Sequence, residues 1–282
     1  TVFVLSYHAL IIKISPQNYQ FLYAMPTSVH PSAQHGFSQT AEIYQLARPS
    51  YPIEIVNWLK QSLQLNASSQ VVDLGAGTGK FIPYLQKITQ KIQAIEPISE
   101  MLEQLKLLYP TVHCIQTDSH QLKLQKESID AILCAQSFHW FANISALQEI
   151  HRVLKPNAAL GLIWNQRDEN VPWVKALADV MQTLEGDTPR YHSGQWKKVF
   201  EDQTLFAMVD QQVLQHQHIG TVQQVVSKRL LSTSFIAALA KEQQQQLKQQ
   251  FEQIVFEHTG LTADQEICFP YQTFAYHFQK LP

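Results

Sequence analysis

The sequence predicts an α/β protein in which helices cover both faces of a doubly wound, mostly parallel sheet. Two observations lead to this prediction. Between residues 52 and 164, short apolar runs alternate with stretches of helical apolar spacing, which is the pattern of right-handed βαβ units. Residues 71–80 then read Val-Val-Asp-Leu-Gly-Ala-Gly-Thr-Gly-Lys, an apolar run that breaks into three glycines. Ligands of such sheets bind where the strands end, so we expect a binding site at this turn.

Five apolar runs in the first half are short enough to be strands that are buried on both faces. We expect these strands at residues 71–74, 92–95, 112–116, 129–135 and 159–164. Between them, apolar residues recur at helical spacing, and Pro52 is well placed as a first helical residue. Helices are therefore predicted at residues 40–47, 52–63, 80–90, 98–109 and 144–154, the last with a capping box of Ser145 and Gln148.

The second half is expected to complete a single domain. Residues 167–205 carry aromatic residues between polar stretches and predict a helical insertion, or lid, over the core. A strand at 209–219, helices at 221–231 and 238–258 and a closing strand at 267–278 are expected to follow. The domain would span residues 37–282 with its core at 37–166, and residues 1–36 would form an N-terminal tail. Because the first methionine is Met25, we expect the working protein to start near it.

The composition argues against several classes of protein. The 282 residues carry a formal net charge of −2, which gives no basic footprint for nucleic acid, and no apolar stretch is long enough to span a membrane. The three cysteines, Cys114, Cys134 and Cys268, show no metal-ligand spacing and suit a reducing compartment. We therefore expect a cytoplasmic protein without a metal centre. The oligomeric state leaves no signature in the sequence.

The glycine turn fits some nucleotide-binding motifs poorly. A phosphate-binding P-loop fails because Leu74 and Phe81 stand where that motif needs a glycine and a hydroxyl group. The dinucleotide pattern G-x-G-x-x-G fits Gly75 and Gly77, but Lys80 occupies the position of the third glycine. A tight turn that binds no ligand is a further alternative.

The spacing Asp73-x-Gly75-x-Gly77-x-Gly79 resembles the first motif of the class I S-adenosylmethionine-dependent methyltransferases. The order in which Glu96-Pro97, Asp118 and the segments 135–141 and 152–156 follow is similar to the small-molecule members of that class. These include the ubiquinone and menaquinone C-methyltransferases and the trans-aconitate methyltransferases. The resemblance covers residues 37–167. It implies a Rossmann-like, seven-stranded sheet with the last strand antiparallel, and S-adenosylmethionine as the cofactor.

Each part of this cofactor needs a different partner. A carboxylate suits the ribose diol, and Glu96 follows the second predicted strand about 20 residues past the loop, as the ribose acid does in dinucleotide folds. The ammonium and carboxylate of the methionine end suit Asp73 and backbone N–H groups. The candidate cofactor-binding residues are Asp73, Gly75, Ala76, Gly77, Gly79, Glu96, Pro97, Met101, Asp118, Ser119 and Gln136. Asp118 and Ser119 would reach the adenine edge, and Met101 would lie on its face or simply in the core.

Methyl transfer depends on alignment, and it needs a base only when the acceptor must lose a proton. His139 is the candidate general base, and a polar pocket wall is its alternative role. The candidate residues of the acceptor pocket are Tyr44, Arg48, Tyr51, Trp140 and Trp164, with Arg167 and His192 as further candidates. His216 and His218 are interpreted as surface residues of a strand.

The expected function is therefore the transfer of a methyl group from S-adenosylmethionine to a small-molecule acceptor. Residues 136–139 read Gln-Ser-Phe-His. Methyltransferases that act on amide nitrogen resemble one another in an Asn/Asp-Pro-Pro-Tyr/Phe turn at this place, so an oxygen or carbon acceptor is favoured. An NAD-dependent oxidoreductase and a non-catalytic adenosyl-binding module are the alternative functions.

Overall fold

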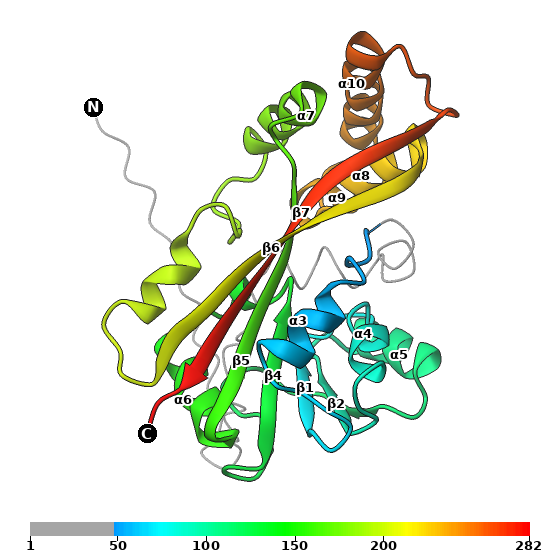
Figure 1. Ribbon diagram of the computed structural model, residues 1–282. Helices are drawn as coiled ribbons and strands as arrows, with labels where there is room; N and C mark the ends of the chain where they lie inside the picture. The colour runs from blue at the N-terminus through cyan, green and yellow to red at the C-terminus, as the bar shows by residue number, and fades with distance from the viewer. Residues whose placement is uncertain (1–47) are drawn as a thin grey trace, which may run out of the picture.

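The computed structural model describes residues 48–282, so Tyr44, the helix expected at 40–47 and the question of a start at Met25 lie outside the described residues. A seven-stranded sheet with the order β3-β2-β1-β4-β5-β7-β6 forms the centre of the molecule (Figure 1). The strands are β1 (Val71–Leu74), β2 (Ile92–Ile95), β3 (His113–Ile115), β4 (Ile129–Ala135), β5 (Leu154–Arg167), β6 (Phe206–Thr221) and β7 (Glu266–Lys280). Strands β1 to β5 pair in parallel, whereas β7 is antiparallel to both β5 and β6. The predicted α/β sheet with an antiparallel last strand is thus confirmed.

Helices cover both faces of this sheet, as a doubly wound fold requires. On one face lie α3 (Ile55–Gln61), α4 (Ile82–Gln86) and α5 (Ser99–Leu108). They pack against every second residue of the strands, whose side chains point toward this face. On the other face, α6 (Ile144–Val153) and a 3₁₀ helix, Gln195–Phe200, pack on the remaining strand residues. Val71 and Val72 show the alternation, because these neighbours lie in the two different apolar clusters.

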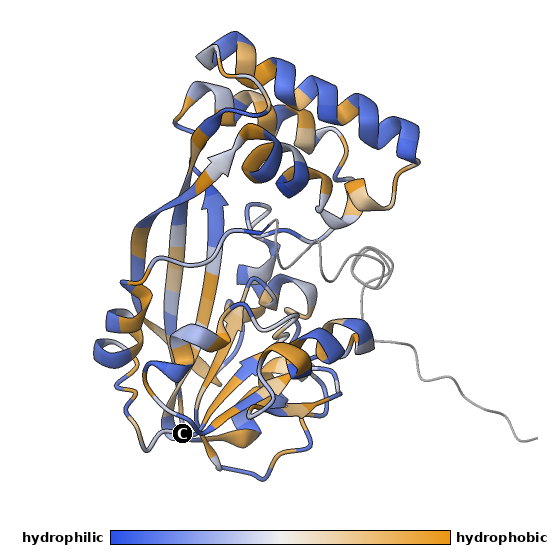
Figure 2. Ribbon diagram, turned by 90° about the vertical axis from the view of Figure 1, so that its right-hand side faces the viewer, coloured by the Kyte–Doolittle hydropathy of each residue, from blue (hydrophilic) through white to orange (hydrophobic). Residues whose placement is uncertain are grey.

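Strands β5, β6 and β7 continue past the other four and carry a second group of helices, which we call the cap (Figure 1). The cap comprises α7 (Pro172–Gln182), the π-helix Gln223–Lys228, α8 (Arg229–Leu231), α9 (Ser234–Ala237) and α10 (Lys241–Thr259). Its own apolar cluster includes Trp173, Phe251 and Phe269. The long helix of the cap, α10, is mostly hydrophilic and turns few side chains inward (Figure 2). Among residues 48–282, no helix combines the length and apolarity needed to cross a bilayer.

Some elements differ from the sequence-based expectation. Helix α4 begins at Ile82 and ends at Gln86, instead of spanning 80–90, because the turn that starts with the glycines continues through residue 81. The capping box expected from Ser145 and Gln148 is wrong, since the side chain of Asn143 caps α6 by accepting a hydrogen bond from Ala146 N at 3.0 Å. Residues 167–205 divide between α7 in the cap and the 3₁₀ helix on the core. The division of the chain into core and insertion stays a prediction.

Candidate active site

Two adjoining pockets lie at the carboxyl ends of the parallel strands. The first pocket is lined by the glycine turn after β1, the tips of β2 and β4, the loop after β3 and parts of the cap and of residues 48–51. It encloses about 1110 Å³, part of which is open to solvent. The candidate cofactor-binding residues that line it are Asp73, Gly75, Ala76, Gly77, Glu96, Pro97, Met101, Asp118, Ser119 and Gln136. Gly79 is not among the lining residues; a Cβ there would lie 2.8 Å from the ring of Tyr109.

The glycine turn has two functions in this pocket. Gly75 has a φ of +69°, and a Cβ on it would lie 2.5 Å from Cβ of Ser137. Gly77 also has a positive φ, of +57°, but a Cβ on it would meet only Sδ of Met101, at 3.5 Å. Gly75 is therefore required by close packing of the turn against the β4 tip. The absence of a side chain at Gly77 leaves room in the pocket for a ligand to approach the backbone.

Glu96 holds the glycine turn in its conformation. Its Oε2 accepts a hydrogen bond from Gly77 N at 2.8 Å, and its Oε1 accepts one from Ile98 N at 3.0 Å. Burial raises the pKa of Glu96 to about 7, although the two amide bonds act in the opposite direction. The N–H of Gly77 is thus already engaged by Glu96.

Asp73 is the most unusual polar residue of the first pocket. Its side chain is 1 % exposed, and among residues 48–282 neither carboxylate oxygen has a hydrogen-bond partner. Burial, and then the charge of Glu96, raise the pKa of Asp73 to about 8. A buried carboxylate without partners is costly, and it becomes stable when a cation or several N–H donors reach it. Asp73 therefore marks a place where a positively charged ligand group would fit.

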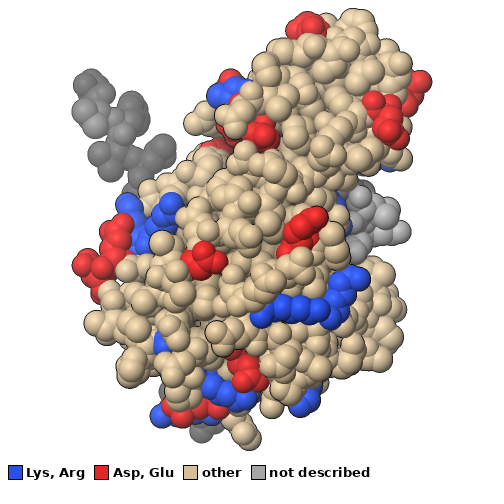
Figure 3. All heavy atoms as spheres, viewed as in Figure 1, with Lys and Arg blue, Asp and Glu red and all other residues tan. Residues whose placement is uncertain are grey.

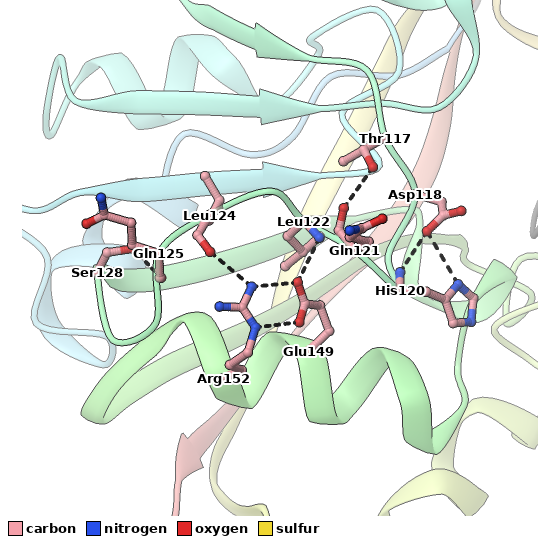
Figure 4. Close-up of polar contacts among 10 residues, drawn as sticks. All are labelled: Thr117, Asp118, His120, Gln121, Leu122, Leu124, Gln125, Ser128, Glu149 and Arg152. Carbon is pink, nitrogen blue, oxygen red and sulfur yellow. Dashed lines mark hydrogen bonds and ion pairs between the residues drawn. The ribbon is translucent and has the colours of Figure 1, made fainter.

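The loop after β3 carries the residues expected at the adenine edge. Oδ1 of Asp118 accepts a hydrogen bond from His120 N at 2.8 Å and lies 3.5 Å from Nδ1 of the same histidine (Figure 4). Helix α6 braces this loop, because Glu149 accepts a hydrogen bond from Leu122 N at 2.8 Å while it pairs with Arg152 at 2.7 Å (Figure 4). Asp118 thus lies on a loop that is hydrogen-bonded to helix α6 of the core.

The second pocket begins where the first ends. Gln136 and Trp140 line both pockets. Gln136 has a φ of +63°, which is rare for a residue with a side chain, and its Nε2 donates a hydrogen bond to Asn165 O at 3.0 Å. The other lining residues of the second pocket are Arg48, His139, Trp164, Asn165, Gln166, Arg167, Arg190, Tyr191, His192, Arg229, Ser234 and Tyr271. Of the acceptor-pocket candidates, Arg48, Trp140 and Trp164 line this second pocket, whereas Tyr51 lines only the first.

His139 is held in a neutral form. Nε1 of Trp164 donates a hydrogen bond to its Nδ1 at 3.0 Å, so the ring proton is assigned to Nε2. Burial and the nearby cations Arg190 and Arg48 lower the pKa of His139 to about 3. A base must have a free lone pair and a pKa near the working pH, and His139 has neither in this arrangement. Its catalytic role stays a prediction, and the geometry favours donation of the Nε2 hydrogen.

Several lining residues were missed by sequence reasoning. Lys80 and Ser137 directly follow the candidate cofactor-binding residues Gly79 and Gln136, so proximity in sequence could have identified them. Arg190 and Arg229 come from distant segments, and no local pattern marks them. His216 and His218 were expected at the surface, but both are half-buried, with ring centroids 6.5 Å from that of Tyr271. Among residues 48–282, no three His, Cys, Asp or Glu side chains are grouped as metal ligands.

Comparison with known proteins identifies the family. Residues 72–162 match the model of a methyltransferase domain. A methyltransferase-like protein of Schizosaccharomyces pombe is 35 % identical over 240 residues, which cover 85 % of this chain and 93 % of the relative. The chain belongs to the class I S-adenosylmethionine-dependent methyltransferases. The matched domain contains the methyltransferase's glycine turn and the tips of β2 and β4, but it ends before the cap.

Two further similarities agree with this methyltransferase assignment. A ubiquinone/menaquinone biosynthesis C-methyltransferase of Campylobacter jejuni is 27 % identical over 159 residues, which cover 51 % of this chain and 67 % of the relative. The solved structure of a putative type II methyltransferase from Anaeromyxobacter dehalogenans superposes with a TM-score of 0.60 at 19 % identity, covering 83 % of this methyltransferase and 97 % of that chain. At 19 % identity, this superposition supports a shared fold alone.

Proposed function

We propose that the methyltransferase binds S-adenosylmethionine in the first pocket and transfers its methyl group to a small molecule in the second pocket. The observation that carries this proposal is Asp73, whose two carboxylate oxygens are buried at the first pocket without a partner among the described residues. The cofactor's ammonium is the kind of group that such a carboxylate needs. The cofactor supplies a methyl carbon that is activated by the neighbouring sulfonium.

The residues of the first pocket suit the rest of the cofactor as well. Glu96 is buried at the tip of β2, and its carboxylate can accept hydrogen bonds from a ribose diol in addition to those from the loop. Asp118 and Ser119 would hold the adenine edge, and Met101 would pack on the adenine face. Gly77 would allow the methionine end to lie close to the backbone. All of these residues line the first pocket, and each is assigned to one part of the cofactor only.

The task of the second pocket is to align the acceptor. Gln136 and Trp140 border both pockets, so they are suited to orient an acceptor against the first pocket. His139 would contribute a hydrogen bond from Nε2 and would remain neutral. The Gln-Ser-Phe-His segment at the β4 tip supports an oxygen or carbon acceptor over an amide nitrogen.

The test of this proposal is a binding and turnover experiment. Calorimetric titration should give micromolar binding of S-adenosylmethionine and S-adenosylhomocysteine and no binding of NADH. Incubation of the enzyme with labelled S-adenosylmethionine and a small-molecule fraction of a lysate should then give a labelled product. Binding of NADH in the same crevice would support an oxidoreductase, and cofactor binding with no labelled product from any fraction would support a binding module. Either result would contradict methyl transfer to a small molecule.

Replacement of Glu96 by alanine should weaken S-adenosylhomocysteine binding by about 1–3 kcal/mol, because buried ribose hydroxyls would lose their acceptor and the Gly77 amide would lose its own. The matched control is Glu103→Ala on α5, where an exposed glutamate forms a surface ion pair with Lys106. Calorimetry of both variants measures the effect. Equal affinity of Glu96→Ala and wild type would rule out the ribose assignment.

The proposal includes no nucleic-acid partner. On the face shown in Figure 3, acidic and basic side chains lie in small separate groups among uncharged residues. The proposed partner is therefore a small-molecule acceptor, and a cytoplasmic location stays a prediction.

A further inference from the structure

Four of the chain's five arginines line the second pocket. They are Arg48, Arg167, Arg190 and Arg229, and they come from four separate parts of the chain. The fifth, Arg152, lies elsewhere and pairs with Glu149 on α6. No aspartate or glutamate is among the residues that line the second pocket. An arrangement that brings nearly all guanidinium groups of a protein to one small pocket concentrates positive charge there.

Two of these arginines lack adequate partners within the described residues. The side chain of Arg167 has no hydrogen bond or ion pair with any residue between 48 and 282, and its Nε is buried without a partner. Arg229 is 5 % exposed, its Nε is also buried without a partner, and its Nη1 lies a long 3.4 Å from Oγ1 of Thr233. Burial and the charge of Arg229 lower the pKa of Arg167 below its usual range. Glu169 and Glu185 act on the pKa of Arg167 in the opposite direction, but neither carboxylate lines the pocket. A bound anion would lower the cost that remains from withdrawing these guanidinium groups from water.

This positive charge extends beyond the cofactor's pocket. Arg48 and Arg229 line both pockets, and Arg48 already donates a hydrogen bond to Ser232 O at 2.9 Å. The carboxylate of the cofactor could reach Arg229 from the first pocket. Arg167 and Arg190 line only the second pocket. A ligand anion that pairs with Arg167 would therefore belong to a molecule in the second pocket, not to the cofactor in the first. The remaining walls include the rings of Trp140, Trp164 and Tyr191, which suit a flat organic body.

We propose that the methyl acceptor is a small organic acid whose carboxylate or phosphate group is bound in the second pocket by Arg167, with Arg190 and Arg229 beside it. This proposal rests on the proposed function, because it names the substrate class of the same site. The planar guanidinium of Arg167 matches a carboxylate or phosphate with two parallel hydrogen bonds, which a lysine could not reproduce. Glu185 lies 4.0 Å from Arg190, but no carboxylate of the described residues is hydrogen-bonded to the side chains of Arg167 or Arg229.

The experiment uses the full chain saturated with S-adenosylhomocysteine. Calorimetry would compare benzoate, cinnamate, citrate and phenyl phosphate with the neutral amides benzamide and cinnamide. We expect at least one acid to bind about tenfold or more tightly than any neutral amide. Comparison of the affinities of the carboxylates with that of phenyl phosphate then identifies which anionic group the pocket prefers. Arg167→Gln should reduce that binding by about tenfold to hundredfold, and Arg167→Lys should restore only part of it.

The controls separate this proposal from the proposed function. Lys198→Gln removes an exposed cation from the 3₁₀ helix Gln195–Phe200 and should leave binding of the acids unchanged. Arg167→Gln should retain wild-type affinity for S-adenosylhomocysteine, because Arg167 does not line the first pocket. Its unfolding temperature should be no lower than that of wild type, because the substitution removes an unpaired cation. If wild-type protein fails to bind S-adenosylhomocysteine, the proposed function is wrong. If it binds this ligand but prefers no acid to its amide, or if Arg167→Gln binds acids as wild type does, the inference about the acceptor is wrong.

Discussion

Replacement of Asp73 by asparagine should weaken S-adenosylmethionine binding by about 2–4 kcal/mol. The substitution keeps the shape of the side chain and removes the charge that would face the cofactor's ammonium. Asp73 has no hydrogen-bond partner among residues 48–282, so no other contact of its carboxylate is lost with the change. The loss of affinity should therefore report the interaction with the ligand. Calorimetric titration of both proteins at pH 8 measures it.

The same substitution should change the pH dependence of the ligand-free protein. Because the pKa of Asp73 is raised to about 8 from 3.8, the folded state binds more protons than the unfolded state between these values. Stability should therefore fall as pH rises from about 4 to about 8, since ionisation leaves a charge buried beside Glu96. Asp73→Asn should resemble wild type at pH 5 and exceed it in denaturant resistance at pH 9. Denaturant unfolding at the two pH values measures this difference.

Cofactor binding should show the opposite trend with pH. Below about pH 8 the carboxyl of Asp73 is protonated in the ligand-free protein, so binding of an ammonium must release that proton. Affinity should rise with pH up to about 8 in wild type and should rise less in Asp73→Asn, where Glu96, with a pKa of about 7, still titrates in the pocket. The exposed Asp202 gives a matched control, because Asp202→Asn should alter neither affinity nor its pH dependence. A flat wild-type profile would contradict the pairing of Asp73 with a cation.

Replacement of Gly75 by alanine should lower the free energy of unfolding by about 2–5 kcal/mol and abolish cofactor binding. Two costs add at this position. The backbone has a φ of +69°, which an alanine adopts only with strain, and the new Cβ would lie 2.5 Å from Cβ of Ser137. Ser137 cannot easily retreat, because its hydroxyl donates a hydrogen bond to Leu74 O at 2.6 Å. Chemical denaturation and calorimetry measure the two effects.

Gly194 separates these two costs. It has the same φ of +69°, but a Cβ built on it would meet no atom within 4 Å. Gly194→Ala should therefore lose only the strain component, about 1–2 kcal/mol, and should bind cofactor as wild type does. If both alanine variants lost the same stability, the contact with Ser137 would not explain the requirement for glycine at position 75.

The sequence predicted the parallel core well because its strands are buried on both faces. The bounds of β1, β2 and β4 agree with those expected from their apolar runs. The rule that ligands bind where strands end then placed the glycine turn, Glu96 and Gln136 around one pocket, and the structure brings them together there. The roles of these residues toward a ligand stay predictions.

The cap and the second pocket could not be predicted in the same way. Arg229 lies in the segment predicted as a helix, but the apolar spacing there identifies only the buried valines and Leu230, not the arginine that faces the pocket. Arg190 lies between α7 and the 3₁₀ helix, where no periodic pattern marks it. His216 and His218 alternate on β6, and no sequence pattern predicts the ring of Tyr271 beside them. No local sequence pattern shows that charged residues from distant segments will meet in one pocket, because their meeting depends on tertiary packing.

The cap is joined to the core by strands instead of flexible loops. Strand β7 pairs with β6 from Glu266 to Lys280 and with β5 from Tyr271 to Gln279, so one hydrogen-bonded ladder runs through both parts. Swinging the cap outward would bend or break this ladder, whereas hinged enzymes move about a few loop residues. Arg167 at the end of β5 and Arg229 in the cap are therefore carried on a stiff frame. This methyltransferase should discriminate among acceptors as a preformed template does, with little of the adaptation that domain closure provides.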